Sequence, residues 1–179
     1  EFVQVQVAEP TAPSALPARP PGAVQIFADQ MSMVQERNLA DARGHVRIIF
    51  EGGELTCDRM TLFTDTKDVY AQGNVRIQRG SEIFRADMAH YNINTRKGRF
   101  LRGRVAQPPW YESGRLAEHL AEGVTRVTPG GVTSCPLDPP HFRFQGRAAT
   151  VFSDESIVKG RHVTLFVEDF PLIYLPWLS

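Results

Sequence analysis

The chain has 179 residues, and its 20 Lys and Arg balance its 20 Asp and Glu, so the formal net charge is zero. This length and a hydrophobic content of 42% suffice for a domain with its own core, whereas interspersed, balanced charge argues against a nucleic-acid binder, which would carry a basic stripe. No run approaches the ~20 apolar residues of a membrane-spanning helix. No signal peptide is recognisable either, so we expect a cytosolic chain or an exported one after cleavage.

Residues 1–22 are rich in proline and alanine, with Pro10, Pro13, Pro17, Pro20 and Pro21 among them. Such a composition buries too little apolar surface to order itself. We therefore predict a tail or linker over residues 1–22 and one folded domain over residues 23–179.

From residue 23 onward an internal repeat dominates the sequence. The segment 44–48, Gly-His-Val-Arg-Ile, recurs 29 residues later as Gly-Asn-Val-Arg-Ile in segment 73–77, and the same offset joins Asp29, Asp58 and Asp87. Weaker copies begin near Gly103 and Gly146. The repeat predicts identical supersecondary units stacked side by side.

Each unit alternates apolar and polar residues with a period of two, as in Val46, Arg47 and Ile48, which is typical of strands. Turn-forming clusters separate these runs at residues 51–53, 65–68, 79–81, 94–98, 129–131 and 153–156. Each unit is thus predicted to be two short antiparallel strands, with ten or more strands in all. Segment 115–122 also fits a helix, because Leu116 and Leu120 are four residues apart, but its place in the repeat favours a strand.

Stacked hairpins bury their apolar faces only by sharing one interior, so we expect an all-β sandwich or rolled solenoid with exposed strand edges at its ends. Such a continuous interior suits a long or acylated ligand. The inward positions that we predict as lipid-groove candidates are Val46, Ile48, Met60, Leu62, Val75, Ile77, Tyr91, Val163 and Leu165. For any single one, a plain core role is the stronger alternative.

The sequence offers no chemistry of catalysis. The five histidines are His45, His90, His119, His141 and His162; they are too far apart in sequence for a metal pair, and we expect them in turns or on the surface. No nucleophile elbow, phosphate loop or dinucleotide fingerprint is present, and the repeated aspartates are expected to accept turn or strand-edge hydrogen bonds. We predict no catalytic residue, no metal, no cofactor and no enzymatic activity.

The two cysteines differ in context. Cys57 lies in a strand pattern and reads about equally as a small buried hydrophobe, whereas Cys135 lies in a polar, turn-rich segment where its thiol would be accessible.

The segments 71–77 (AQGNVRI) and 85–92 (RADMAHYN) resemble the hairpin repeat of OstA-like domains, which build the lipopolysaccharide transport bridge of Gram-negative bacteria. Two further segments, 133–135 (TSC) and 171–178 (PLIYLPWL), resemble the outer-membrane component of the LPS-assembly family. The resemblance covers about residues 23–179. It implies a V-shaped β-jellyroll of stacked antiparallel hairpins that ends where an outer-membrane barrel would begin.

By this resemblance the chain is expected at the periplasmic face of the outer membrane, where its groove would shelter the acyl chains of lipopolysaccharide and pass them to the barrel. An LptA-like bridge protein would add a strand at the edge that contains Ile26, Ala28, Met31 and Met33. An LptE-like outer-membrane lipoprotein would act through the barrel. Cys135 would form an interdomain disulfide with the barrel, although in the isolated domain it could stay free or pair with Cys57.

Two alternatives stay open. The chain could be an LptA-like bridge component, or a β-solenoid scaffold or polysaccharide-binding module that transports nothing. A groove lined with aromatic and acidic residues would favour the polysaccharide-binding alternative.

Overall fold

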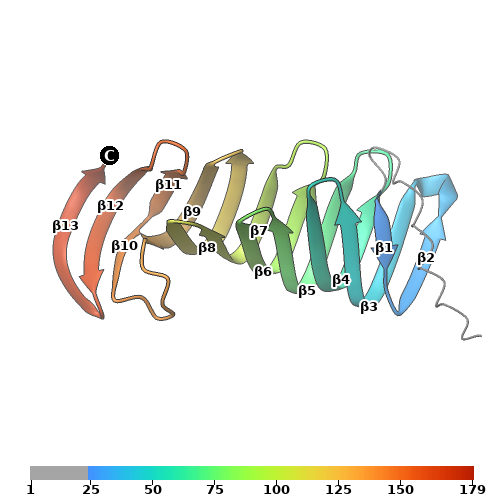
Figure 1. Cartoon of the computed structure of the whole chain (residues 1–179), viewed down its shortest axis with the longest axis horizontal. Helices are drawn as coiled ribbons and strands as arrows, with labels where there is room; N and C mark the ends of the chain where they lie inside the picture. The colour runs from blue at the N-terminus through green and yellow to red at the C-terminus, as the bar shows by residue number, and fades with distance from the viewer. Residues whose placement is uncertain (1–23) are drawn as a thin grey trace, which may run out of the picture.

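The computed structural model describes residues 24–179, so the predicted tail over residues 1–22 lies outside the described part. The described chain is an all-β fold, as predicted, with one short 3-10 helix (Figure 1). Its elements are β1 (Gln25–Phe27), β2 (Gln30–Val34), η1 (Gln35–Arg37), β3 (Leu39–Phe50), β4 (Gly53–Phe63), β5 (Asp68–Arg79), β6 (Glu82–Asn92), β7 (Gly98–Gln107), β8 (Trp110–Ala121), β9 (Val124–Thr133), β10 (Phe142–Gly146), β11 (Ala148–Phe152), β12 (Ile157–Val167) and β13 (Phe170–Leu178). Within residues 24–179, no helix is long and apolar enough to cross a membrane.

All thirteen strands belong to one antiparallel sheet. From β3 to β9 each strand pairs with the next one in the chain, so each 29-residue unit forms a hairpin and the next unit continues the sheet. At one end β1 and β2 both pair with β3, and at the other end β13 pairs with β12. β10 and β11 both lie between β9 and β12, where together they replace one long strand.

Most strands have 10–12 residues and are bent in the middle, which corrects the expectation of short strands. In β3 the bend lies at Gly44 and His45, with φ of 74° and 44°, and in β5 at Gly73 and Asn74, with φ of 76° and 46°. These residues interrupt the pairing with the neighbouring strand. Left-handed backbone favours glycine, so the repeated Gly-X pair marks the line along which the sheet folds into two layers.

The sheet folds into the two layers of a jellyroll at these bends, and its two long borders approach each other. Arg79 ends β5 at one border and Glu122 follows β8 at the opposite border, yet Arg79 Nη2 lies 3.8 Å from Glu122 Oε1. Phe50, at the end of β3, and Tyr91, near the end of β6, likewise come from opposite borders, and their rings are 6.0 Å apart. These contacts define a seam that closes the interior.

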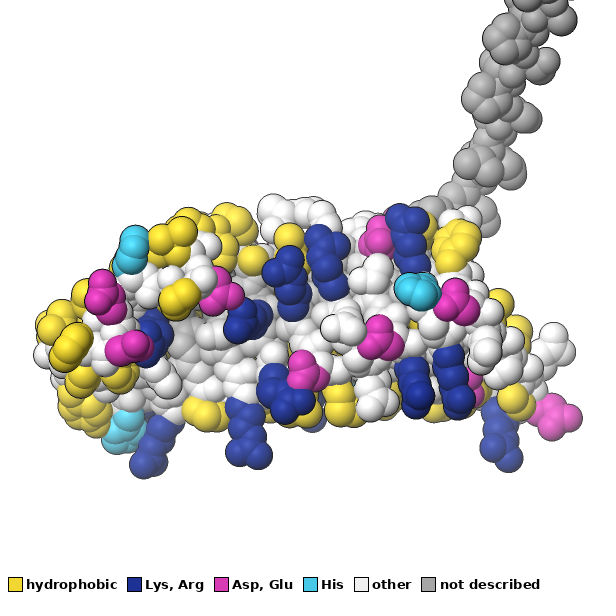
Figure 2. Space-filling model, turned by 90° about the horizontal axis from the view of Figure 1, so that it is seen from below, with side chains coloured by type: hydrophobic (Ala, Val, Ile, Leu, Met, Phe, Trp, Pro, Cys, Tyr) yellow, Lys and Arg dark blue, Asp and Glu magenta, His cyan; other side chains and the backbone are white. Residues whose placement is uncertain are grey.

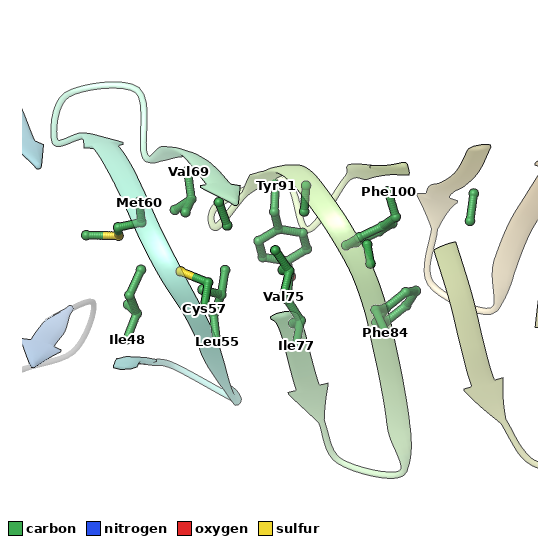
Figure 3. Close-up of a cluster of buried hydrophobic side chains, with 14 of the residues drawn as sticks. Ile48, Leu55, Cys57, Met60, Val69, Val75, Ile77, Phe84, Tyr91 and Phe100 are labelled. Atoms are coloured by element: carbon green, nitrogen blue, oxygen red, sulfur yellow. The ribbon is translucent and has the colours of Figure 1, made fainter. Parts of the chain in front are cut away.

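The interior is built from rows of side chains that are direct partners across the strands. The first interior row consists of Ile26, Ile48, Leu55, Ile77, Phe84, Val105, Glu112, Val132, Phe144 and Leu165, and it ends at Ile173 of the edge strand β13, which is 52% exposed. The second interior row, in the other layer, consists of Ala40, Leu62, Val69, Tyr91, Gly98, His119, Thr125, Val151 and Val158. From β3 to β6 the side chains of these rows pack between the layers into one core (Figure 3).

One local prediction is confirmed in β8, and another is wrong in β9. The segment with Leu116 and Leu120 is strand, as preferred, because it lies within β8. The turn predicted at residues 129–131 is wrong, since Gly130 and Gly131 lie inside β9. A Cβ on Gly130 would come within 2.5 Å of the Ser113 carbonyl oxygen, so glycine allows the close approach of β8 rather than a turn.

Candidate functional site

The predicted groove residues come together in the interior between the two layers. Seven of them belong to the buried core cluster: Val46, Ile48, Met60, Leu62, Val75, Ile77 and Tyr91. Val163 is also buried, whereas Leu165 is half-buried. In this structure they pack into the core and solvent hardly reaches them, so a ligand between the layers would have to displace these contacts.

The seam combines ion pairs to the exposed Glu122 with the buried ring contact between Phe50 and Tyr91. Glu122 is exposed and lies 3.8 Å from both Arg79 Nη2 and Arg96 Nη1. Arg79 also lies 3.6 Å from Glu82. Ion pairs that reach solvent contribute little stability, typically about 0–1 kcal/mol each. The ion pairs to Glu122 therefore contribute little to closing the interior, whereas Phe50 and Tyr91 bury two aromatic rings at the same seam.

The interior is not apolar along its whole length. All five buried polar residues of the described chain lie on β7, β8 and β9: Gln107, Glu112, His119, Thr125 and Thr133. His119 corrects the expectation that every histidine lies in a turn or on the surface, because it is only 2% exposed and its ring packs 5.2 Å from Phe84. Burial lowers the pKa of His119 to about 4, and burial together with nearby Glu82 raises the pKa of Glu112 to about 8.

Sequence reasoning missed Glu112 because alternation assigns polar residues to the outer face. The missing signal was register: Glu112 is the direct partner of Val105 and Val132, both fully buried.

The repeated aspartates stabilise the bends. Asp29 Oδ2 lies 2.8 Å from His45 Nδ1, and Asn74 Nδ2 donates a 2.9 Å hydrogen bond to Asp58 Oδ2. Asp87 pairs in the same way with Arg102. Their predicted role as hydrogen-bond acceptors is confirmed.

The remaining histidines form no cluster. His45 contacts Asp29, whereas His162 contacts Tyr174, so these two histidines do not meet. Within residues 24–179 no group of three or more potential ligands could hold a metal ion.

Both cysteines are free thiols. Cys57 is 4% exposed, and burial raises the pKa of its thiol to about 12. Cys135 is 9% exposed, which corrects the expectation of an accessible thiol. Its Sγ lies 4.0 Å from Nδ1 of His141, and its backbone N–H donates to Thr133 Oγ1.

Apolar side chains are exposed at both ends of the sheet. In the predicted partner edge, Met31 and Met33 are 60% and 61% exposed, while Ile26 and Ala28 are half-buried against the core. At the other end Phe170, Tyr174 and Trp177 of β13 are exposed, and Figure 2 shows hydrophobic side chains gathered there. Large exposed apolar areas mark contact surfaces in soluble proteins.

A depression of about 490 Å³ lies on the outer face of the sheet. Tyr70 and His90 stack in it with ring centroids 4.6 Å apart, and Met88 and Leu101 are exposed beside them. Of the predicted groove residues, it includes only Met60.

No family model matches the chain. Curated proteins do match it: it is 25% identical over 158 residues to the LPS-assembly protein LptD of Nitrosomonas eutropha, and 24% identical over 174 residues to LptD of Vibrio cholerae. These alignments cover 87% and 96% of the chain. Over most of its length the chain is thus similar to part of proteins named LPS-assembly protein LptD. It spans 22% and 21% of the length of those two relatives.

Among solved structures, LptH of Pseudomonas aeruginosa, described as the LptA-homologous periplasmic component of a lipopolysaccharide transport device, is similar at 12% identity and a TM-score of 0.33. That match covers 82% of this chain and 96% of LptH.

Proposed function

We propose that this LptD-type domain acts in lipopolysaccharide transport and assembly at the outer membrane, where its interior shelters the lipid's acyl chains. The observation that carries the proposal is the first interior row, which runs across the sheet with a single polar member, Glu112. Relatives named LPS-assembly protein support this function over a scaffold or polysaccharide-binding role.

The physical basis is the burial of hydrocarbon, which contributes roughly 25 cal/mol per Å². This attraction is non-directional, so an acyl chain can slide along the row without breaking specific contacts. The acyl chain enters as the seam between Arg79 and Glu122 opens, and the sugars of the lipid stay in water. Nothing in this process requires a covalent step, and we propose that the domain is not an enzyme.

The ends of the sheet suit a relay at the periplasmic face of the outer membrane. We propose that a periplasmic bridge protein of the LptA type adds a strand next to β1 and β2, with Met31 and Met33 continuing the interior into the partner. At the other end β13 would lead into an outer-membrane barrel, which binds an LptE-like lipoprotein. Residues 23–179 would then be one domain of a longer protein, with Cys135 bonded to a cysteine of the barrel.

A thermal-shift comparison tests this function. Lipid A should raise the melting temperature of the chain, because a ligand that binds only the folded state stabilises it, whereas a soluble oligosaccharide without acyl chains should not. If the oligosaccharide raised the melting temperature and lipid A did not, the result would favour a polysaccharide-binding module, with the outer depression at Tyr70 and His90 as its site.

A further inference from the structure

Three buried polar side chains of β8 and β9 face the interior. Glu112 is 3% exposed, His119 2% and Thr125 0%, and we call these three residues the polar collar. Glu112 belongs to the first interior row and His119 to the second, so one strand, β8, carries both. Thr125 is the direct partner of His119 on β9.

None of the polar atoms in these three side chains has a hydrogen-bond partner within the described chain. Both carboxyl oxygens of Glu112, both ring nitrogens of His119 and Oγ1 of Thr125 are unpaired. By contrast Thr133, also buried on β9, donates a 2.6 Å hydrogen bond to the carbonyl oxygen of Phe142. Unpaired buried polar groups are rare in folded proteins because they destabilise the fold, so a retained set needs a reason.

The collar is uncharged near neutral pH. The pKa of Glu112 is raised to about 8 by burial and by Glu82, and that of His119 is lowered to about 4 by burial and by Arg79, against the opposite effect of Glu122. A protonated carboxyl, a neutral imidazole and a hydroxyl each donate and accept hydrogen bonds.

The position of the collar relates it to the rest of the interior. From β3 to β6 no polar or charged residue of the described chain is buried, and the buried polar side-chain atoms there without a hydrogen-bond partner are the hydroxyl of Tyr91 and Oε2 of Glu82. An acyl chain that moved from β3 toward β13 would therefore pass a mostly apolar stretch and then meet the collar. Its methylene groups gain nothing there, whereas polar groups at its head would find unpaired donors and acceptors.

We propose that the polar collar is a binding subsite for the uncharged polar groups of an acylated glycolipid, namely the hydroxyl, ester and amide groups that link its chains to its sugars. This inference rests on the proposed function. The collar would pause the ligand in one register, with its linkages at β8 and its chains extended toward β6.

The chemistry of the collar argues against a phosphate as its ligand. A phosphate would need cations, yet Arg79, the arginine that acts on His119, already lies near Glu82 and Glu122. A neutral carboxyl adds no positive charge. Uncharged donors and acceptors match uncharged linkages.

Substitution of the collar separates this subsite from general apolar binding. Glu112→Leu and His119→Leu remove hydrogen-bonding groups and keep side-chain bulk, whereas Glu112→Gln keeps an uncharged donor and acceptor as the matched control. Two probes are titrated into the chain: lipid A, which carries the linkages, and diphenylhexatriene, a fluorescent hydrocarbon. We expect about tenfold weaker binding of lipid A to each leucine variant, equal to the loss of one or two hydrogen bonds. Binding of diphenylhexatriene should be unchanged or stronger, and Glu112→Gln should bind both probes like the wild type.

The outcomes are distinguishable. If the leucine variants bind lipid A as tightly as the wild type, or lose affinity for both probes equally, the collar is not a subsite and only this inference fails. If the wild type binds no lipid A at all, the proposed function fails with it. Should a leucine variant not fold, the isosteric Thr125→Val variant makes the same comparison, and unchanged lipid A affinity in that variant also overturns the subsite.

Discussion

The buried carboxyl of Glu112 should make the stability of this fold fall as the pH rises, and Glu112→Gln should remove that dependence. In the folded chain the pKa of Glu112 is about 8, whereas its ordinary value is 4.5. Between these two pH values the unfolded chain releases the proton and the folded chain keeps it. The folded state then holds more protons than the unfolded state, so the free energy of unfolding decreases with pH, by at most about 1.4 kcal/mol per pH unit.

Summed from pH 4.5 to pH 8, this dependence amounts to about 5 kcal/mol at its upper bound. That is a large part of the 5–15 kcal/mol that typically stabilises a folded domain. Glutamine has nearly the same shape and cannot ionise, so the variant should equal the wild type in stability near pH 4.5 and exceed it increasingly up to pH 8.

The contribution of His119 to stability depends on pH in the opposite direction and over a lower pH range. Its folded pKa is about 4 and its ordinary value is 6.5, so as the pH falls through this interval the unfolded chain takes up a proton that the folded chain refuses. Stability is lost on acidification, by about 3 kcal/mol at most. Between pH 4.5 and 6.5 the two effects cancel, which predicts a plateau for the wild type, a fall on acidification for Glu112→Gln and a continued rise for His119→Gln.

The assay is urea unfolding of the wild type and both variants at half-unit steps from pH 4.5 to 8.5. Differences from the wild type cancel the contributions of all other titrating groups. A constant difference in unfolding free energy between the wild type and Glu112→Gln across this range would refute the reasoning.

Three further predictions concern the bends, a thiol and the partner edge. Gly73→Ala should lower the free energy of unfolding by about 1–3 kcal/mol, because φ is 76° and the new Cβ would lie 2.3 Å from Asp58 Oδ2. Gly80→Ala is the control: its φ is 56° and its new Cβ would have nothing within 4 Å, so it should lose less stability in urea unfolding. Equal losses in the two variants would contradict the role of Asp58. Cys57 should not react with Ellman's reagent at pH 8 until urea unfolds the chain, because the pKa of its thiol is about 12; the test uses a Cys135→Ser variant, in which Cys57 is the only cysteine. Fast labelling of Cys57 in native buffer would show that the interior opens there. A double variant, Met31→Asp with Met33→Asp, should no longer be captured by a periplasmic bridge protein, and its melting temperature should be unchanged because both side chains are exposed. The control Ser32→Asp, on the opposite face of β2, should be captured like the wild type.

Much of the architecture was predictable from the repeat. The 29-residue offset, the period of two and the turn clusters predict an antiparallel sheet of hairpins, and eight of the nine groove candidates are buried. Strand length was not predictable, because Gly44 and His45 interrupt the pairing of β3 with β4 although the strand continues through them. Ala40 and Ala42 keep the phase of Val46 and Ile48 and are both 1% exposed, but alanine is too weak an apolar signal to mark them as core.

The polar collar could not be predicted from the sequence, for a different reason. Alternation assigns a polar residue to the solvent side, and only the pairing of β8 with β7 and β9 places Glu112 between two buried valines. His119 was hidden by the helix-like spacing of Leu116 and Leu120, which obscured the phase of β8. Register depends on contacts distant in sequence, and local patterns do not encode them.

The central claim is that acyl chains occupy the interior between the two layers, and site-specific photo-crosslinking in cells tests it most directly. A photoreactive amino acid at Ile48 or Ile77 points inward, and one at the adjacent Arg47 or Arg76 points outward. The proposal predicts crosslinks to lipopolysaccharide from Ile48 and Ile77 and none from Arg47 and Arg76. Crosslinks from the arginine positions alone would contradict it.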